Sequence, residues 1–326
     1  MHDFIAIGDT VVDAFIRLKN AEELVNHGTL ELCLPFAEKV PYEDVYIIPA
    51  VGNAANAGVA AVRLGLSSAL VTNIGSDQNG QDCLNRLSGE KVDTRFVKIN
   101  EGAKTNYHYV LWFHVDRTIL VKHEAYDYSL PDIGEPKWVY LSSLADNTLD
   151  YHNQIASYLK AHPNVSLAFQ PGTFQIKLGY EALKDLYQVS KIFFCNVEEA
   201  ERILSIDTLG IEELLKRMKA LGPQIVVITD GPKGAYAYDG TTIYQQLPYP
   251  DPKAPYERTG AGDAFASTCV SALALEKDLP TALQWGAVNS MSVVQQVGAQ
   301  KGLLSREKIE EYLKSAPAEF QTKKLS

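Results

Sequence analysis

The chain has 326 residues, of which 46% are hydrophobic and 21% are charged, and its formal net charge is −10. This is the composition of a globular protein, and the length suits a single α/β domain spanning residues 1–326. The acidic balance argues against a nucleic-acid surface and against an anionic membrane surface. No apolar stretch has the length of a membrane span and no signal-peptide pattern is visible, so we expect a cytoplasmic protein.

The first part of the chain combines buried and exposed elements. The apolar run 4–7, which ends at Gly8, predicts a short buried strand. Residues 19–48 show no clean period, and Pro49 with the prolines before it favours short edge strands and loops. The alanine-rich run before Gly65 predicts a helix with a glycine C-cap. The elements predicted here are helices at 54–64 and 81–87 and strands at 68–74, 106–113 and 117–121.

From residue 137 onward strands and helices alternate, which predicts a mostly parallel sheet with helices on both faces. The pair Asp239-Gly240 predicts a hairpin. Segments 14–50 and 100–122 are rich in strands and interrupt the alternation, so we expect them to form a small β-sheet lid. The elements predicted after residue 137 are strands at 138–141, 165–169, 192–195, 225–229, 235–238 and 242–246 and helices at 151–159, 198–204, 211–221, 261–275, 281–297 and 306–313.

A glycine-rich turn stands immediately before the helix predicted at 261–275. Gly260, Ala261 and Gly262 precede Asp263, and small residues at this place let a ligand approach the backbone closely. The N–H groups at a helix start carry partial positive charge and suit a phosphate or a developing oxyanion. Asp263 then lies beside an anion site, where a carboxylate can accept the proton of an attacking hydroxyl. The alternative is a plain turn with a helix-stabilising aspartate.

Two further motifs place amides and carboxylates at element ends. Asn53 and Asn56 are three residues apart at a predicted helix start, so both amides can point into one cleft, although Asn53 also suits an N-cap. Asp9 and Asp13 follow the first strand, and ligands of α/β sheets gather at the carboxyl ends of strands. Local turn chemistry is an alternative, mainly for Asp9.

A fourth motif, residues 196–199, follows the strand predicted at 192–195. Asn196 can cap the helix that comes next. Asn196 and Glu199 can also orient a hydrated magnesium ion, because Mg²⁺ keeps most of its waters and uses few protein ligands. Both readings stay open from the residues alone.

These four motifs, in this order along nearly the whole chain, resemble the ribokinase-like, or PfkB, family of carbohydrate kinases. The turn 260–263 is similar to the family's C-terminal signature, and residues 51–56 are similar to its N-terminal Gly-Gly signature. The resemblance implies an α/β fold, namely a ribokinase-like three-layer sandwich with a central mostly parallel sheet and a small β-sheet lid. It also implies ATP and Mg²⁺ as cofactors.

The resemblance assigns roles to individual residues. It implies Asp263 as the base and the N–H groups of Gly260, Ala261 and Gly262 as the anion hole. Substrate contacts would come from Asp13, Gly52, Asn53 and Asn56. Nucleotide contacts would come from Asn196, Thr229, Gly231 and Asn289, and magnesium would be held through water by Asn196 and Glu199. A potassium ion would lie near Gly298.

Three departures from the family pattern affect these expectations. Val51 replaces the first glycine of the usual pair, and a β-branched residue restricts a lid hinge. Glu257-Arg258-Thr259 stands where many members have Asp-Thr-Thr, so the need for potassium is an open question. The segment between Asp13 and the asparagine motif is long, which suggests an enlarged lid or a homodimer contact through the lid.

The expected function is an ATP-dependent kinase acting on a sugar hydroxyl. The alternative within the enzyme class is a nucleoside kinase, because Tyr107 and Tyr109 share a strand face and could stack on a base. Dimer packing explains the same aromatics equally well. A sugar phosphate is a further option, with Lys104, Arg117 and Arg258 available for its phosphate. A non-catalytic sugar or nucleotide sensor is the alternative from another class.

Overall fold

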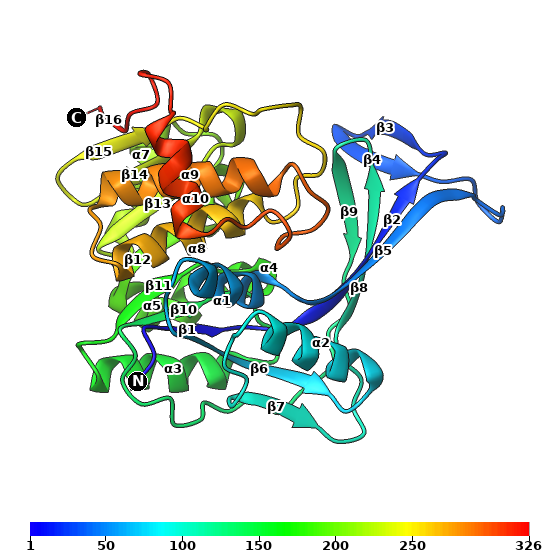
Figure 1. Cartoon of the computed structure of the whole chain (residues 1–326), viewed down its shortest axis with the longest axis horizontal. Helices are drawn as coiled ribbons and strands as arrows, with labels where there is room; N and C mark the ends of the chain where they lie inside the picture. Colours follow the sequence, from blue (N-terminus) through cyan, green and yellow to red (C-terminus); the bar gives the residue numbers. More distant parts are fainter. Residues whose placement is uncertain (326) are drawn as a thin grey trace.

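A large sheet lies between two helical layers, and a smaller sheet projects from its side (Figure 1). The structure is a computed structural model that describes residues 1–325. The strand order of the large sheet is β16-β15-β14-β13-β12-β11-β10-β1-β6-β7, and it is parallel from β7 to β13. Its strands are β1 (Phe4–Ile7), β6 (Ser68–Gly75), β7 (Val97–Asn100), β10 (Trp138–Leu141), β11 (Ser166–Phe169), β12 (Ser190–Asn196), β13 (Ile225–Thr229), β14 (Ala235–Tyr238), β15 (Ile243–Gln246) and β16 (Lys323–Lys324).

Both faces of the large sheet are buried, so its central strands are apolar without alternation. In β1, Phe4 and Ala6 pack into one core cluster, while Ile5 and Ile7 pack into the other. One face is covered by α1 (Asn53–Arg63), α2 (Gln78–Gly89), α8 (Ala261–Ala274), α9 (Leu279–Val293) and α10 (Arg306–Lys314). The other face is covered by α3 (Leu149–Ala161), α5 (Tyr180–Val189), α6 (Val197–Leu204) and α7 (Ile211–Ala220).

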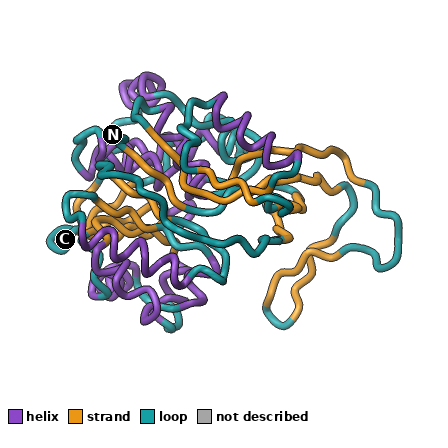
Figure 2. Tube along the Cα trace, turned by 90° about the horizontal axis from the view of Figure 1, so that it is seen from below, coloured by secondary structure: helices purple, strands orange, loops and turns teal. Residues whose placement is uncertain are grey.

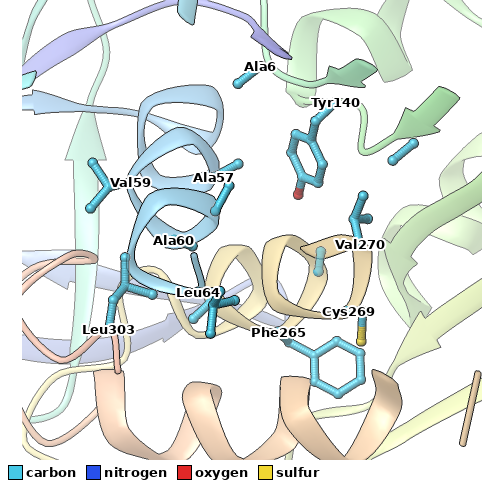
Figure 3. Packing of buried hydrophobic residues seen from close by; sticks show 14 of the residues in the cluster. Ala6, Ala57, Val59, Ala60, Leu64, Tyr140, Phe265, Cys269, Val270 and Leu303 are labelled. Carbon is cyan, nitrogen blue, oxygen red and sulfur yellow. The ribbon is translucent and has the colours of Figure 1, made fainter. Parts of the chain in front are cut away.

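Small side chains let α1 and α8 approach each other closely. Figure 3 shows Ala57 and Ala60 of α1 beside Val270 and Cys269 of α8, with Tyr140 above them. Because alanine occupies little space, the starts of these two helices converge at the same end of the large sheet. That convergence brings the asparagine motif and the glycine-rich turn together.

The smaller sheet has the strand order β5-β2-β8-β9 and is called the lid sheet below. Its strands are β2 (Val11–Leu18), β5 (Tyr42–Val51), β8 (Tyr107–Phe113) and β9 (Asp116–Leu120). A hairpin of β3 (Glu22–Asn26) and β4 (Thr29–Cys33) extends from it into solvent (Figures 1 and 2). No helix within residues 1–325 has both the length and the apolarity needed to cross a bilayer.

The α/β sandwich and the second sheet match the expectation, but several boundaries differ. Pro49 lies inside the ten-residue strand β5, which an edge strand tolerates because one side of it donates no ladder bonds. Residues 97–100 form β7 in the large sheet, so Asn100, where the second lid segment was predicted to begin, lies outside the lid sheet. Helix α9 ends at Val293, four residues earlier than predicted. The short helix α4 (Thr173–Leu178) and α5, separated by Gly179, have no counterpart in the prediction.

Candidate active site

A cleft of about 570 Å³ opens between the carboxyl ends of the parallel strands and the lid sheet. Strand ends and helix starts supply its floor, including Asn196 after β12 and Thr229 at the end of β13. The lid sheet supplies Asp13, His108 and Arg117. Most of the residues expected at the site line this one cleft: Asp13, Gly52, Asn53, Asn56, Asn196, Glu199, Thr229, Gly260, Ala261, Gly262 and Asp263.

Asp263 lies at the base of the cleft, in the first turn of α8. Its Oδ2 accepts a hydrogen bond from Asn56 Nδ2 at 2.9 Å, and its Oδ1 accepts one from Gln170 Nε2 at 3.3 Å. Burial raises the pKa of Asp263 above its ordinary value, and the bonds from Asn56 and Gln170 oppose that rise by stabilising the carboxylate. A carboxylate with a raised pKa is a better proton acceptor for an alcohol.

The glycine-rich turn before α8 has a backbone that requires glycine at Gly260. This residue has φ +80°, and a Cβ on it would lie only 2.2 Å from the Cβ of Ala299. Gly262 has open space on its Cα, so nothing obstructs a ligand there. The first N–H groups of a helix have no intrahelical acceptor. An anion beside Asp263 can therefore bind the Gly262 N–H and compete for the Ala261 N–H, which makes only a 3.4 Å bond to the Arg258 carbonyl.

A second cavity, of about 500 Å³, continues from the cleft across the glycine-rich turn. Thr229, Arg258, Ala261 and Gly262 line both cavities. The remaining walls are mainly apolar and come from the 231–235 turn, residues 246–255, α8 and the C-terminal half of α9 with its cap. They include Gly231, Leu247, Pro248, Phe265, Ala287, Met291 and Val294. A polar cleft that joins an apolar cavity through an anion-binding turn has the features needed to hold a substrate, a phosphate chain and an aromatic base.

Asn196 and Glu199 form a reciprocal capping box at the start of α6. Asn196 Oδ1 accepts from the Glu199 N–H at 2.8 Å, and Glu199 Oε2 accepts from the Asn196 N–H at 2.9 Å. The capping role is therefore present, and it orients both side chains at the cleft wall. Glu199 Oε1 has no part in the box, so an oxygen remains for a hydrated cation. Burial raises the pKa of Glu199.

Two aspartate–histidine pairs occupy the end of the cleft below the lid sheet. His108 Nδ1 lies 3.5 Å from Asp13 Oδ1. Asp9 is almost fully buried, and its carboxylate accepts from His123 Nδ1 at 2.9 Å and from the Tyr128 hydroxyl at 2.8 Å. Because a carboxylate oxygen accepts hydrogen bonds, His123 Nδ1 is the donor in this contact. Asp9 thus orients a histidine.

The model of the pfkB family of carbohydrate kinases matches residues 48–306. The chain belongs to the pfkB carbohydrate kinase family. It is 26% identical to ribokinase of Bacillus subtilis over 272 residues, which cover 80% of this chain and 87% of that protein. It is 25% identical to a nucleoside kinase of Methanocaldococcus jannaschii over 303 residues, which cover 89% and 95% of the two chains. This pfkB-family protein is therefore a phosphotransferase with an alcohol group as acceptor.

Solved structures share the fold of this chain. The structure of Arabidopsis thaliana ribokinase complexed with ribose and ATP superimposes with a TM-score of 0.78 at 20% identity, covering 96% of this chain and 99% of that one. At such identity the likeness concerns the fold: a three-layer α/β sandwich with a separate small sheet.

Tyr107 and Tyr109 do not face the cleft of this pfkB-family kinase. They share one face of β8, as their spacing predicts, but that face lines a separate surface pocket with Lys104. Side chains alternate along a strand, so the residue between them, His108, is the one that reaches the cleft. The prediction that a substrate stacks on these two tyrosines is therefore wrong. Lys104 lines the same separate pocket, so it does not reach a substrate phosphate in the cleft.

Asn289 also differs from its expected role. It lies on α9, whose neighbouring residues Ala287, Ser290 and Met291 line the second cavity, but Asn289 is not among the lining residues. Its fully buried side chain donates to Thr268 Oγ1 at 2.7 Å and accepts from the Leu304 N–H at 2.9 Å. The helix borders the cavity as expected, while Asn289 faces the core, because successive helical residues point about 100° apart.

In the segment 257–259, where this kinase departs from the family pattern, the buried carboxylate has hydrogen-bond donors for both of its oxygens. Glu257 is fully buried, and its Oε1 accepts from the Thr259 N–H at 2.7 Å and from the Thr259 hydroxyl at 2.5 Å. The Gly298 N–H reaches Glu257 Oε2 at 3.4 Å. Arg258 reaches across to the lid sheet, where its Nη1 lies 3.6 Å from Asp116 Oδ2.

At the junction of β5 and α1, the residues on either side of Val51 have positive φ angles, and Val51 itself does not. Ala50 has φ +58° and Gly52 has φ +107°. A Cβ on Gly52 would lie 2.6 Å from the Asp9 carbonyl oxygen, so glycine is required there. Ala50 adopts a left-handed backbone conformation although it is not a glycine, and this has a modest energetic cost.

Sequence reasoning missed several residues of the cleft. His108, His123, Gln170 and Phe174 line it without belonging to any motif. Gln170 follows β11 directly, so its place at a strand's carboxyl end was a usable signal. His123 lies in the irregular segment after β9 and carries no local signal that separates it from a surface histidine.

Proposed function

We propose that this kinase transfers the γ-phosphoryl group of ATP to a hydroxyl of a sugar, with Asp263 as the general base. The observation that carries the proposal is the position of Asp263, beside the glycine-rich turn that lies between the two cavities. The apolar cavity suits the adenine, the turn suits the phosphates, and the polar cleft suits a polyhydroxylated acceptor.

The reaction is an in-line displacement. The acceptor oxygen forms a bond to the γ-phosphorus as the bond from phosphorus to the β–γ bridging oxygen breaks, which releases ADP. The hydroxyl proton passes to the Asp263 carboxylate. The N–H groups of Ala261 and Gly262 stabilise the negative charge on the transferring phosphoryl oxygens, and the lid sheet limits the access of water.

Magnesium fits the oxygen donors at the cleft wall. Within residues 1–325, no group of three or more His, Cys, Asp or Glu side chains is placed to hold a metal directly. Asn196 and Glu199 would hold a hydrated ion through its waters, in keeping with the hard-oxygen preference of Mg²⁺. When bound to ATP, Mg²⁺ neutralises charge on the phosphates.

A sugar acceptor is favoured by the polar groups around Asp263. Asp13, Asn53 and Asn56 offer a carboxylate and two amides, and sugar hydroxyls need both donors and acceptors. A nucleoside is the second candidate, because aromatic rings also meet in the cleft. The His123 ring centroid lies 5.3 Å from that of His108 and 5.5 Å from that of Phe174. Such rings could pack against a base.

A homodimer through the lid sheet is a further part of the proposal. The face of this sheet that points away from the cleft carries a row of residues paired across its four strands, Ile47, Ala14, Tyr109 and Leu120. Ile47, Tyr109 and Leu120 are about half exposed or more, at 62%, 49% and 52%. An apolar sheet face of this kind suits a second copy of the chain.

The test measures ADP release from MgATP against free sugars, nucleosides and sugar phosphates, with Asp263→Asn as the matched variant. Turnover on one acceptor, reduced by about 10²–10⁴-fold in the variant, supports the proposal and identifies the substrate class. Equal turnover by both proteins removes Asp263 as the base. ATP binding without turnover on any acceptor favours the sensor alternative.

A further inference from the structure

Three consecutive residues after α9 contact three different parts of the site. A Cβ on Gly298 would lie 2.4 Å from Ile48 Cδ1, so this glycine lets the lid sheet pack closely. Ala299 packs against Gly260 of the glycine-rich turn. Gln300 is 1% exposed and points toward the start of α1. The segment therefore joins the lid sheet, the anion-binding turn and the asparagine motif.

The amide of Gln300 uses its nitrogen for two acceptors. Its Nε2 donates to the Ala50 carbonyl at 2.6 Å and to Asn56 Oδ1 at 3.1 Å. Its Oε1 accepts from Arg86 Nη2 at 3.4 Å. An amide nitrogen has two N–H donors, so both are engaged and the orientation of the Gln300 amide is determined.

This orientation determines that of Asn56. Since Asn56 Oδ1 faces the Gln300 donor, Asn56 Nδ2 faces Asp263 and donates to its Oδ2 at 2.9 Å. With the amide turned over, Asn56 would present an oxygen to the carboxylate, and two acceptors would oppose each other. Asn56 is 3% exposed, so water cannot easily take over the role of either partner.

The other acceptor of Gln300 lies in the connection between the lid sheet and α1. Ala50 has φ +58°, its N–H donates to Cys83 Sγ at 3.2 Å, and its carbonyl accepts from Gln300. A left-handed alanine persists only where its surroundings hold it. The same amide group thus contacts the lid connection and the residue that donates to Asp263.

We propose that Gln300 is a positioning residue that, through Asn56, holds the Asp263 carboxylate in its ionised, hydrogen-bonded state while the lid connection is in the observed conformation. The inference rests on the proposed function for the role of Asp263 as base, but the hydrogen-bond chain itself does not depend on it. Gln300 is separated from Asn56 by 244 residues in sequence, and Asn56 from Asp263 by 207, so only the fold assembles the chain.

The test is a carboxyl ¹³C NMR titration of protein labelled at aspartate, without substrate, in which the Asp263 resonance is assigned as the one absent from Asp263→Asn. We expect Gln300→Met to raise the pKa of Asp263 by about one pH unit. Without the Gln300 donor, the Asn56 amide is no longer held with Nδ2 toward Asp263, and the hydrogen bond from Asn56 to the carboxylate is lost. In an Asn56→Ala background the same substitution should add no further shift. Gln295→Met, which replaces another buried glutamine of the same segment, should leave the titration unchanged.

An unchanged Asp263 titration in folded Gln300→Met overturns the inference, and so does an equal shift in the Asn56→Ala background. If Gln300→Met does not fold, Gln300→Asn replaces it, because the shorter amide cannot reach Asn56 and the expected shift is the same. Where an acceptor is phosphorylated, the acid limb of kcat/KM should move by the same amount as the NMR midpoint. Failure to find any turnover would count against the proposed function and leave the NMR result to decide on Gln300.

Discussion

Asn56 Nδ2 donates a 2.9 Å hydrogen bond to Asp263 Oδ2, and this contact joins the first turns of helices α1 and α8. The amide that we expect to contact the substrate and the general base of the proposed reaction are therefore joined by one hydrogen bond. An acceptor hydroxyl that approaches Asp263 must do so beside Asn56. In the proposed reaction this arrangement would couple substrate recognition to proton transfer, because movement of α1 relative to α8 would change both.

The pH profile of kcat/KM should show an acid limb with a midpoint above 3.8, the ordinary value for an aspartic acid. The ionised carboxylate is the active form, so activity falls as the pH drops through the pKa of Asp263, and burial moves that pKa upward. Initial rates between pH 4 and 8 check this. A rate that stays constant down to pH 4 would contradict the role of Asp263.

Stability should decrease as the pH falls from about 6.5 to about 4 because of His152. This histidine is buried, its Nδ1 donates to the Thr148 carbonyl and its Nε2 accepts from Gln175, so the ring is neutral, and burial lowers its pKa to about 4. The unfolded state binds a proton below 6.5 while the folded state does not, which costs up to about 3 kcal/mol by pH 4. Urea unfolding of His152→Gln should lose most of this pH dependence; an unchanged dependence would assign it to other groups.

Ser290→Trp should raise the KM for ATP by at least tenfold while changing the KM for the acceptor little. Ser290 lines the apolar cavity, and an indole there occupies space proposed for the adenine. Gln284→Trp, on the same helix but outside the cavity lining, is the matched control. Equal effects of the two substitutions would place the adenine elsewhere.

Tyr109→Glu should convert a dimer into a monomer at micromolar concentration. The substitution puts a charge in the middle of the apolar row on the lid sheet, where burial against a second copy would be costly. Light scattering after size-exclusion chromatography measures the mass, with the exposed α2 substitution Gln81→Glu as control. A wild-type protein that is monomeric under these conditions would refute the interface.

Replacement of K⁺ by a bulky organic cation should change kcat less than twofold. The Glu257 carboxylate already accepts three hydrogen bonds from Thr259 and Gly298, and these bonds stabilise its negative charge in place of a cation. Assays at constant ionic strength in potassium and in tetramethylammonium chloride make the comparison. A large loss without potassium would show that the departure at residues 257–259 preserves a cation site.

Local chemistry in the sequence determined the parts of this protein that lie within one turn of chain. The glycine-rich turn with Asp263, the amides 53 and 56, and the Asn196–Glu199 pair each act through residues three or fewer apart, so their spacing predicts their geometry. The alternation of strands and helices after residue 137 predicts the layered sandwich in the same way, because periodicity is a local property. The layered α/β fold and the motif residues of the cleft could therefore be predicted.

Tertiary structure alone decided which faces the remaining side chains present. The expectation for Tyr107 and Tyr109 concerned a strand whose two faces are both apolar or aromatic, so composition could not say that His108 is the residue facing the cleft. The orientation of Asn289 depends on how α9 packs on α8. The contacts from Gln300 to Asn56 and from His123 to Asp9 span 244 and 114 residues, and no local pattern encodes a pairing that forms only when distant segments pack together.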